Sequence, residues 1–133
     1  PADLSDFEFV RHNPVQLIFL LSIAWLLVIP YEEIIFRGFV LTTLRHLFND
    51  TQGLKGVGST FQGWRFWLAG LIQSVIFAAY HWQEGASAVI SIFIGAVLTV
   101  WLYKIFRGNL WYLVFYHAAF DTVMLYLFAF GYL

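Results

Sequence analysis

The sequence predicts an all-α fold, a polytopic membrane bundle of about four to five transmembrane helices. Of its 133 residues, 61% are hydrophobic and only 11% are charged, whereas a soluble domain carries about 25% charged residues. The mean hydropathy is +0.75, so polar side chains are too few to cover a water-facing surface. The apolar residues also gather in stretches close to the roughly 20 residues that a helix needs to cross a bilayer.

Composition excludes several classes of protein. The net charge of −1 leaves no basic field for binding nucleic acid. The absence of cysteine excludes disulfides, thiolate metal sites and a cysteine nucleophile. We expect residues 1–133 to form a single membrane-embedded domain with a polar N-terminal flank at 1–14. Because the chain opens with Pro1, we expect it to be processed or to be a piece of a longer protein.

Five apolar stretches define the expected helices, and they cover residues 15–30, 31–48, 65–82, 86–106 and 111–131. The first two are short, and Pro30 separates them. Since proline either breaks a helix or occupies its first turn, we favour two helices joined by a tight turn over one long kinked helix. The segment 49–63 is rich in Gly, Ser and Thr, and we expect it to be a polar loop.

Basic residues outside the spans indicate the orientation. If 65–82 and 86–106 both cross the membrane, loop 45–65 and turn 104–110 lie on the same side. That side carries Arg45, Lys55, Arg65, Lys104 and Arg107. The opposite turn, 83–86, carries Glu84 and no basic residue. The positive-inside rule therefore predicts that loop 45–65 and turn 104–110 are cytoplasmic.

Few ionisable residues lie inside the apolar sequence, and they are Glu32, Glu33, Arg37, His81, His117 and Asp121. Glu33 and Arg37 are four residues apart and can neutralise each other on one helical face. His117 and Asp121 share the same spacing, while Glu32 points about 100° away from Glu33 and lacks that partner. Each could be structural by itself, as a helix-stabilising ion pair, an interfacial histidine or a buried hydrogen-bonded pair. Together they predict a functional site, because charges within a membrane are costly.

The chemistry available to this set is hydrolysis. A carboxylate in a low-dielectric setting, such as Glu32, can take a proton from water and return it to a leaving amine. A neutral histidine can hold the same water, and a second histidine can donate to a developing oxyanion. We expect neither a cofactor nor a metal to be required. A serine mechanism is disfavoured, because Ser74, Ser87 and Ser91 lie in expected helices and not in a G-x-S-x-G turn.

Three short motifs carry a resemblance to a known family. EEIIFR (32–37) fits an E-E-x-x-x-R motif, FAAYH (77–81) fits F-x-x-x-H, and HAAFD (117–121) fits H-x-x-x-Asn/Asp. In order and spacing these resemble the CAAX protease and bacteriocin-processing family. The unmarked segment 93–111 is similar to the glycine-containing helix and Gly-Asn turn of that family. The resemblance covers about residues 25–125.

The resemblance implies an all-helical intramembrane glutamate protease that cleaves a prenylated CAAX C-terminus or a bacteriocin or leader peptide. By this resemblance, Glu32 is the catalytic base and His81 its partner on the water. His117 and Asp121 form the oxyanion side, and Glu33, Arg37 and Phe77 support the site. The implied partners are a peptide or lipidated-protein substrate and the lipid bilayer. The sequence predicts no particular oligomeric state.

The chain departs from the family pattern in two respects. The prenyl-protease branch typically has Asn at the position of Asp121, and an ionised Asp cannot donate to an oxyanion. We therefore favour Asp121 as an acceptor that orients His117. Family members commonly have further membrane segments, so the chain is either a shorter member or a core fragment.

Two other readings stay open. The carboxylates and histidines could hold a metal ion, although no H-E-x-x-H motif is present. A non-proteolytic protein of the same fold, serving in immunity, scaffolding or a proton or solute path, would also use such residues. With two short helices, Glu32 and His81 would lie near the membrane side opposite His117. The site therefore requires offset helices or one long helix that places Glu32 at mid-membrane.

Overall fold

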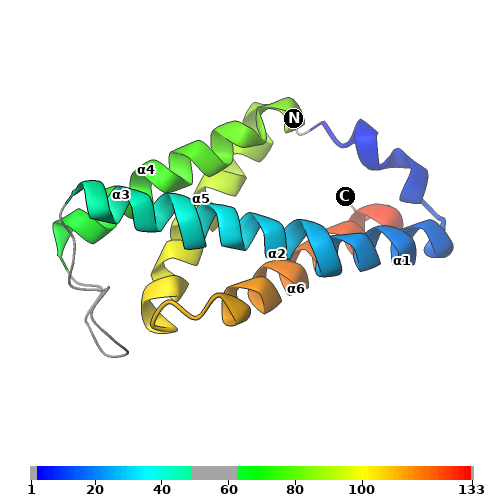
Figure 1. The fold of residues 1–133 in the computed structure, drawn as a ribbon. Coiled ribbons are helices and arrows are strands. Elements are labelled where there is room, and N and C mark those ends of the chain that lie inside the picture. The colour runs from blue at the N-terminus through cyan, green and yellow to red at the C-terminus, as the bar shows by residue number, and fades with distance from the viewer. Residues whose placement is uncertain (1–2, 49–62, 133) are drawn as a thin grey trace.

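The computed structural model describes residues 3–48 and 63–132, which form helices and connecting turns with no β-strand (Figure 1). This confirms the predicted all-α class. Four long helical segments build the described part of the bundle, and they are Pro14–Leu47, α4 (Trp64–Tyr80), α5 (Ala86–Ile105) and α6 (Leu110–Ala129). The first of them is called the long helix below.

The long helix is continuous, so the prediction of two helices separated at Pro30 is wrong. It consists of α1 (Pro14–Ile23), α2 (Ile29–Glu32) and α3 (Leu41–Leu47), joined by the π-helical segments Ala24–Val28 and Glu33–Val40. Its start follows ordinary capping rules, because the Asn13 side chain accepts a hydrogen bond from the Gln16 amide and a proline occupies the first turn.

The π-helical segment before Pro30 explains why the helix does not break there. Inside an α-helix a proline ring clashes with the carbonyl four residues earlier and removes a hydrogen bond. In this chain the preceding turn is wide, and the Ile29 amide donates to the Ala24 carbonyl five residues back. A wide turn of this kind separates the ring from the carbonyl that it would otherwise meet. Sequence pattern alone does not reveal such a turn.

Three helices in the described residues are long and apolar enough to cross a membrane, namely the long helix, α5 and α6. At 1.5 Å per residue the 34-residue long helix extends about 51 Å, well beyond a hydrocarbon core of about 30 Å. With 17 residues, α4 is about 26 Å long, and the predicted number of four spans is reached if it also crosses. Large apolar side chains such as Leu26, Ile34 and Ile94 are exposed on the outer surface, as expected for a lipid-facing bundle.

The helices pack around several small cores and not around one. At one end of the bundle the core joins all four segments through Leu41, Phe66, Val100, Tyr103 and Leu113. The end of α3, the start of α4 and the α5–α6 turn therefore lie at the same end, as Figure 1 shows. Asn109 caps α6 by accepting a hydrogen bond from the Trp111 amide, so the Gly-Asn turn marks where α6 begins.

The N-terminal flank crosses the opposite end of the bundle. A 3₁₀ turn at Ser5–Val10 packs beside α6, and the His12 amide donates to the Ala129 carbonyl. The Asp3 amide reaches the Glu84 carbonyl in the α4–α5 turn at 2.8 Å. The flank thus links the start of α1 to the end of α4 (Figure 1). The expected polar loop at 49–63 lies outside the described residues except for Gly63.

Candidate active site

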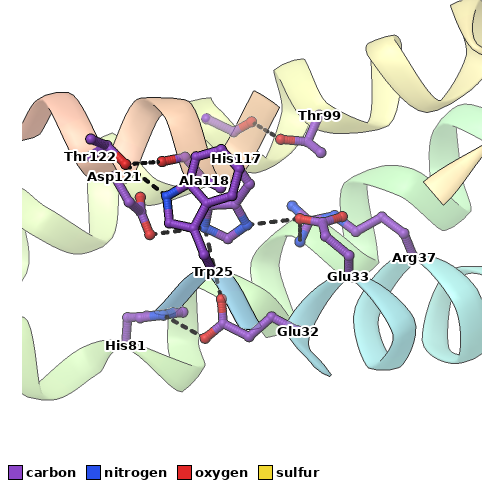
Figure 2. Close-up of polar contacts among 11 residues, drawn as sticks. Trp25, Glu32, Glu33, Arg37, His81, Thr99, His117, Ala118, Asp121 and Thr122 are labelled. Atoms are coloured by element: carbon purple, nitrogen blue, oxygen red, sulfur yellow. Dashed lines mark hydrogen bonds and ion pairs between the residues drawn. The ribbon is translucent and has the colours of Figure 1, made fainter. Parts of the chain in front are cut away.

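Two adjacent carboxylates near the middle of the long helix face different partners. Glu33 is fully buried, and its Oε1 lies 3.2 Å from Nη1 of Arg37, whose side chain is 1% exposed. This is the four-residue ion pair expected from the sequence. Glu32 points to a different face, and its carboxylate lies between two histidines (Figure 2). The two acids therefore supply one carboxylate paired with Arg37 and one that has no Arg or Lys at ion-pair distance among residues 3–48 and 63–132.

His81 contributes from the end of α4. Its Nδ1 lies 2.9 Å from the Phe77 carbonyl oxygen, which can only accept, so Nδ1–H is the donor. In the neutral ring this leaves Nε2 without a proton. Nε2 faces Oε1 of Glu32 at 3.7 Å. The backbone of α4 thus fixes which nitrogen of His81 is presented to the carboxylate.

His117 contributes from α6 and contacts three carboxylates. Its Nδ1–H donates to Oε1 of Glu33 at 2.8 Å. Its Nε2 lies 3.8 Å from Oε2 of Glu32 and 3.5 Å from Oδ2 of Asp121. The short hydrogen bond that sets the ring orientation therefore comes from Glu33, whereas Asp121 lies beside the other nitrogen.

The Phe77 ring forms one wall of the site. The guanidinium carbon of Arg37 lies 4.4 Å from the ring centroid, within cation–π range. Phe36 packs edge-on against the same ring at 4.8 Å, and the His81 ring is also 4.8 Å away. Phe77 thus lies between the buried Arg37 and His81.

Because the long helix is continuous, Glu32 and His117 do not lie near opposite sides of the membrane, as two short helices would require. Glu32 is the nineteenth residue of Pro14–Leu47, close to the midpoint, and not near a helix end as two separate helices would have it. His117 lies in the first half of α6 and reaches this midpoint because α6 runs antiparallel to the long helix (Figure 1). All six ionisable residues from the sequence therefore lie within one cluster.

Two residues near the cluster were not anticipated. The indole Nε1–H of Trp25 donates to Oγ1 of Thr122 at 2.9 Å, which links the long helix to α6 (Figure 2). Trp25 lies eight residues before Glu33, which is a helical spacing, and Thr122 directly follows Asp121. These spacings are the only sequence signal for Trp25 and Thr122. Spacing by itself does not show which of the six tryptophans lies near the site.

The described residues contain no group of three or more His, Cys, Asp or Glu side chains arranged to hold a metal ion. The contacts of Glu32 with the two histidines are too long for direct hydrogen bonds. They are short enough for one water molecule to contact the carboxylate and an imidazole together. The arrangement can therefore hold a water molecule between Glu32 and an imidazole.

The fold and these contacts define a membrane-embedded helical protein with a glutamate–histidine site. A family model described as "Type II CAAX prenyl endopeptidase Rce1-like" matches residues 14–123, and the chain belongs to this family. The family is one of proteases, so the chain is an integral membrane protein of the peptide hydrolase class. No curated protein and no solved structure gives a significant match.

Proposed function

We propose that the chain is an intramembrane endopeptidase in which Glu32 activates water without a metal or cofactor. The observation that carries this proposal is the position of the Glu32 carboxylate, 3.7 Å from Nε2 of His81 and 3.8 Å from Nε2 of His117. Water placed there meets two acceptors, the carboxylate and the unprotonated nitrogen of His81. Each takes one of its hydrogens, which leaves an oxygen lone pair for the substrate carbonyl.

The reaction follows from this placement. Glu32 takes a proton from water as the oxygen attacks the scissile carbonyl carbon, and the carbonyl electrons move to the oxygen. The tetrahedral intermediate collapses, the C–N bond breaks, and the proton on Glu32 passes to the leaving amine. The products are a carboxylic acid and an amine, and Glu32 is again a carboxylate.

In this mechanism His117 stabilises the oxyanion. The role requires a proton on Nε2, because only an N–H can donate to the developing charge. The fully charged ring has acceptors on both sides, Glu33 at Nδ1 and Asp121 at Nε2. Asp121 then serves as the acceptor that holds Nε2–H before substrate arrives, and Arg37 pairs with Glu33 in its buried position.

We propose a peptide bearing a prenylated CAAX C-terminus as the substrate, because the matched family is described by that activity. A bacteriocin or leader peptide is the alternative that the same experiment distinguishes. The purified protein is incubated in detergent with prenylated CAAX peptides, their unprenylated counterparts and leader peptides, and products are identified by mass. Cleavage of the prenylated set alone supports the proposal, and cleavage of leader peptides alone overturns the proposed substrate.

Glu32→Gln tests the mechanism. Removing a general base typically costs about 10²–10⁴ in rate, so we expect cleavage to fall by at least 10² while far-UV circular dichroism is unchanged. His81→Ala should lower the cleavage rate by a similar factor. Glu8→Gln is the matched control, because it makes the same chemical change in the exposed N-terminal flank. A Glu32→Gln protein that cleaves at the wild-type rate would refute the glutamate mechanism.

Two further measurements address the remaining alternatives. Activity retained in full after exhaustive chelation excludes the metal site, and activity lost on chelation and regained with added metal supports it. If the folded wild-type protein cleaves none of the peptides, a non-proteolytic role is favoured. Proton uptake into vesicles, compared between wild type and Glu32→Gln, then tests a proton path.

We also propose that residues 1–133 form one membrane domain with loop 45–65 and turn 104–110 in the cytoplasm. The basic residues support this orientation, and the end of α3, the start of α4 and the α5–α6 turn share one end of the bundle. Because the chain has no cysteine, single-cysteine variants give a clean test. A membrane-impermeant maleimide added to intact cells should label Gln83→Cys and spare Arg107→Cys. The reverse pattern would invert the orientation.

A further inference from the structure

We propose that Trp25 and Thr122 are positioning residues that hold His117 and Asp121 in place relative to Glu32. The indole Nε1–H donates to Thr122 Oγ1 at 2.9 Å, and the Thr122 hydroxyl donates in turn to the Ala118 carbonyl at 2.6 Å. The Thr122 hydroxyl is therefore both acceptor and donor, and its direction is fixed at both ends. The proposal rests on the proposed function of the Glu32 site.

The bond forms a second polar contact between the long helix and α6. The first is the 2.8 Å hydrogen bond between Glu33 and His117. Trp25 precedes Glu33 by eight residues, or about 12 Å along the helix, and Thr122 follows His117 by five, or about 7.5 Å. Two directional contacts this far apart restrict both sliding and rotation of one helix against the other, whereas a single contact acts as a pivot.

The layer between the two contacts does not itself set the register. Ile29 and Ala118 form it, both buried and apolar, and Val114 of the same cluster lies on the other side of His117. Apolar packing has no preferred hydrogen-bond direction, and between helices in lipid it lacks the hydrophobic driving force that operates in water. Interhelical hydrogen bonds and close packing therefore decide the alignment. A small rotation of α6 would move Nε2 of His117 away from its 3.8 Å distance to Glu32.

The neighbours of the pair support a role at the site. Thr122 directly follows Asp121, so the bond that anchors Thr122 also restricts where the Asp121 carboxylate points (Figure 2). Trp25 belongs to the π-helical segment Ala24–Val28, and such segments occur frequently at functional sites. Its ring also packs edge-on against Phe115 at 6.1 Å, which holds the indole against α6.

Thr122→Val tests the proposal, because valine keeps the shape of threonine and lacks the hydroxyl. Thr122→Ser restores the hydroxyl and should rescue the protein. Thr99→Val is the matched control, since the Thr99 hydroxyl donates to the Gly95 carbonyl in its own helix and, among residues 3–48 and 63–132, makes no hydrogen bond to another helix. Two readouts are compared: kcat and KM for a cleaved peptide, and the ¹⁵N and proton resonances of the His117 ring in detergent.

We expect Thr122→Val to lower kcat about fivefold to tenfold, as for loss of one hydrogen bond in an aligned site, with KM changed less than twofold. The His117 ring resonances should shift in Thr122→Val and return in Thr122→Ser. Thr99→Val should match wild type in both measurements. Unchanged kcat and His117 resonances in Thr122→Val would overturn the proposal, as would a Thr122→Ser protein as impaired as Thr122→Val.

If Thr122→Val does not fold, Trp25→Phe replaces it, because phenylalanine retains an aromatic ring against Phe115 and removes the donor. Trp25→Phe should then lower kcat and shift the His117 ring resonances, and no change in either would overturn the proposal. If the wild-type protein cleaves no peptide, the proposed function fails, while the His117 resonances still decide whether the pair positions the ring. The two failures are therefore distinguishable.

Discussion

Glu33→Gln is predicted to destabilise the protein by about 3 kcal/mol. Glutamine keeps the shape of Glu33 and can still accept from His117, but it leaves the Arg37 guanidinium, 1% exposed, without its ion-pair partner 3.2 Å away. Removing one partner of a buried pair typically costs about 3–5 kcal/mol. We expect the lower end, because the Glu32 carboxylate lies one residue along. The Phe77 contact with Arg37 is present in both proteins and does not offset the loss.

The free energy of unfolding is measured by titrating SDS into the detergent-solubilised protein and following helical circular dichroism. The double variant Glu33→Gln/Arg37→Met removes both charges and provides the critical comparison. It should be at least about 1 kcal/mol more stable than Glu33→Gln alone, because no buried charge is left unpaired. A cost below about 1 kcal/mol for Glu33→Gln, or additive effects of the two single changes, would show that the pair is not the buried anchor inferred here.

Three further changes test the packing. Gly70→Ala should lower the free energy of unfolding by about 1–3 kcal/mol, because the added Cβ would lie 2.5 Å from Cγ1 of Val100. Gly95→Ala meets open space and should be neutral or stabilising. Equal effects of the two changes would contradict the close approach of Gly70 to Val100. Phe77→Leu should cost about 1–3 kcal/mol in the same SDS titration through lost ring packing and the cation–π contact, and an unchanged unfolding curve would refute a supporting role. Pro30→Ala should leave the helical circular dichroism unchanged, since the helix already continues there; a clear gain in helicity would indicate a break.

The sequence was most informative where spacing and composition act directly. Low charge and long apolar stretches predicted the all-α membrane class, which the structure confirms. Four-residue spacing predicted the contact of Glu33 with Arg37 and placed Glu32 on a different face. These inferences succeed because helical geometry converts a residue interval into a direction.

The features that sequence reasoning missed depend on contacts between distant segments. Pro30 predicted a break because its effect on an α-helix is known, but the wide turn before it forms only in three dimensions. The closest carboxylate to His117 is that of Glu33, 84 residues earlier, and not that of Asp121 four residues later. Trp25 meets Thr122 across 97 residues. No local sequence pattern predicts these contacts between distant residues.

The π-helical segment Glu33–Val40 has a consequence for how the chain tolerates changes in length. A π turn contains about one residue more than an α turn. Losing one residue after Arg37, such as the exposed Phe39, lets the segment tighten to an ordinary helix while α3 keeps its direction. Losing one residue from α2 turns the paired acids by about 100° relative to the preceding helix if Ala24–Val28 keeps its π-helical turn. Natural variation in length should therefore fall downstream of the acid pair and spare the turn that bears it.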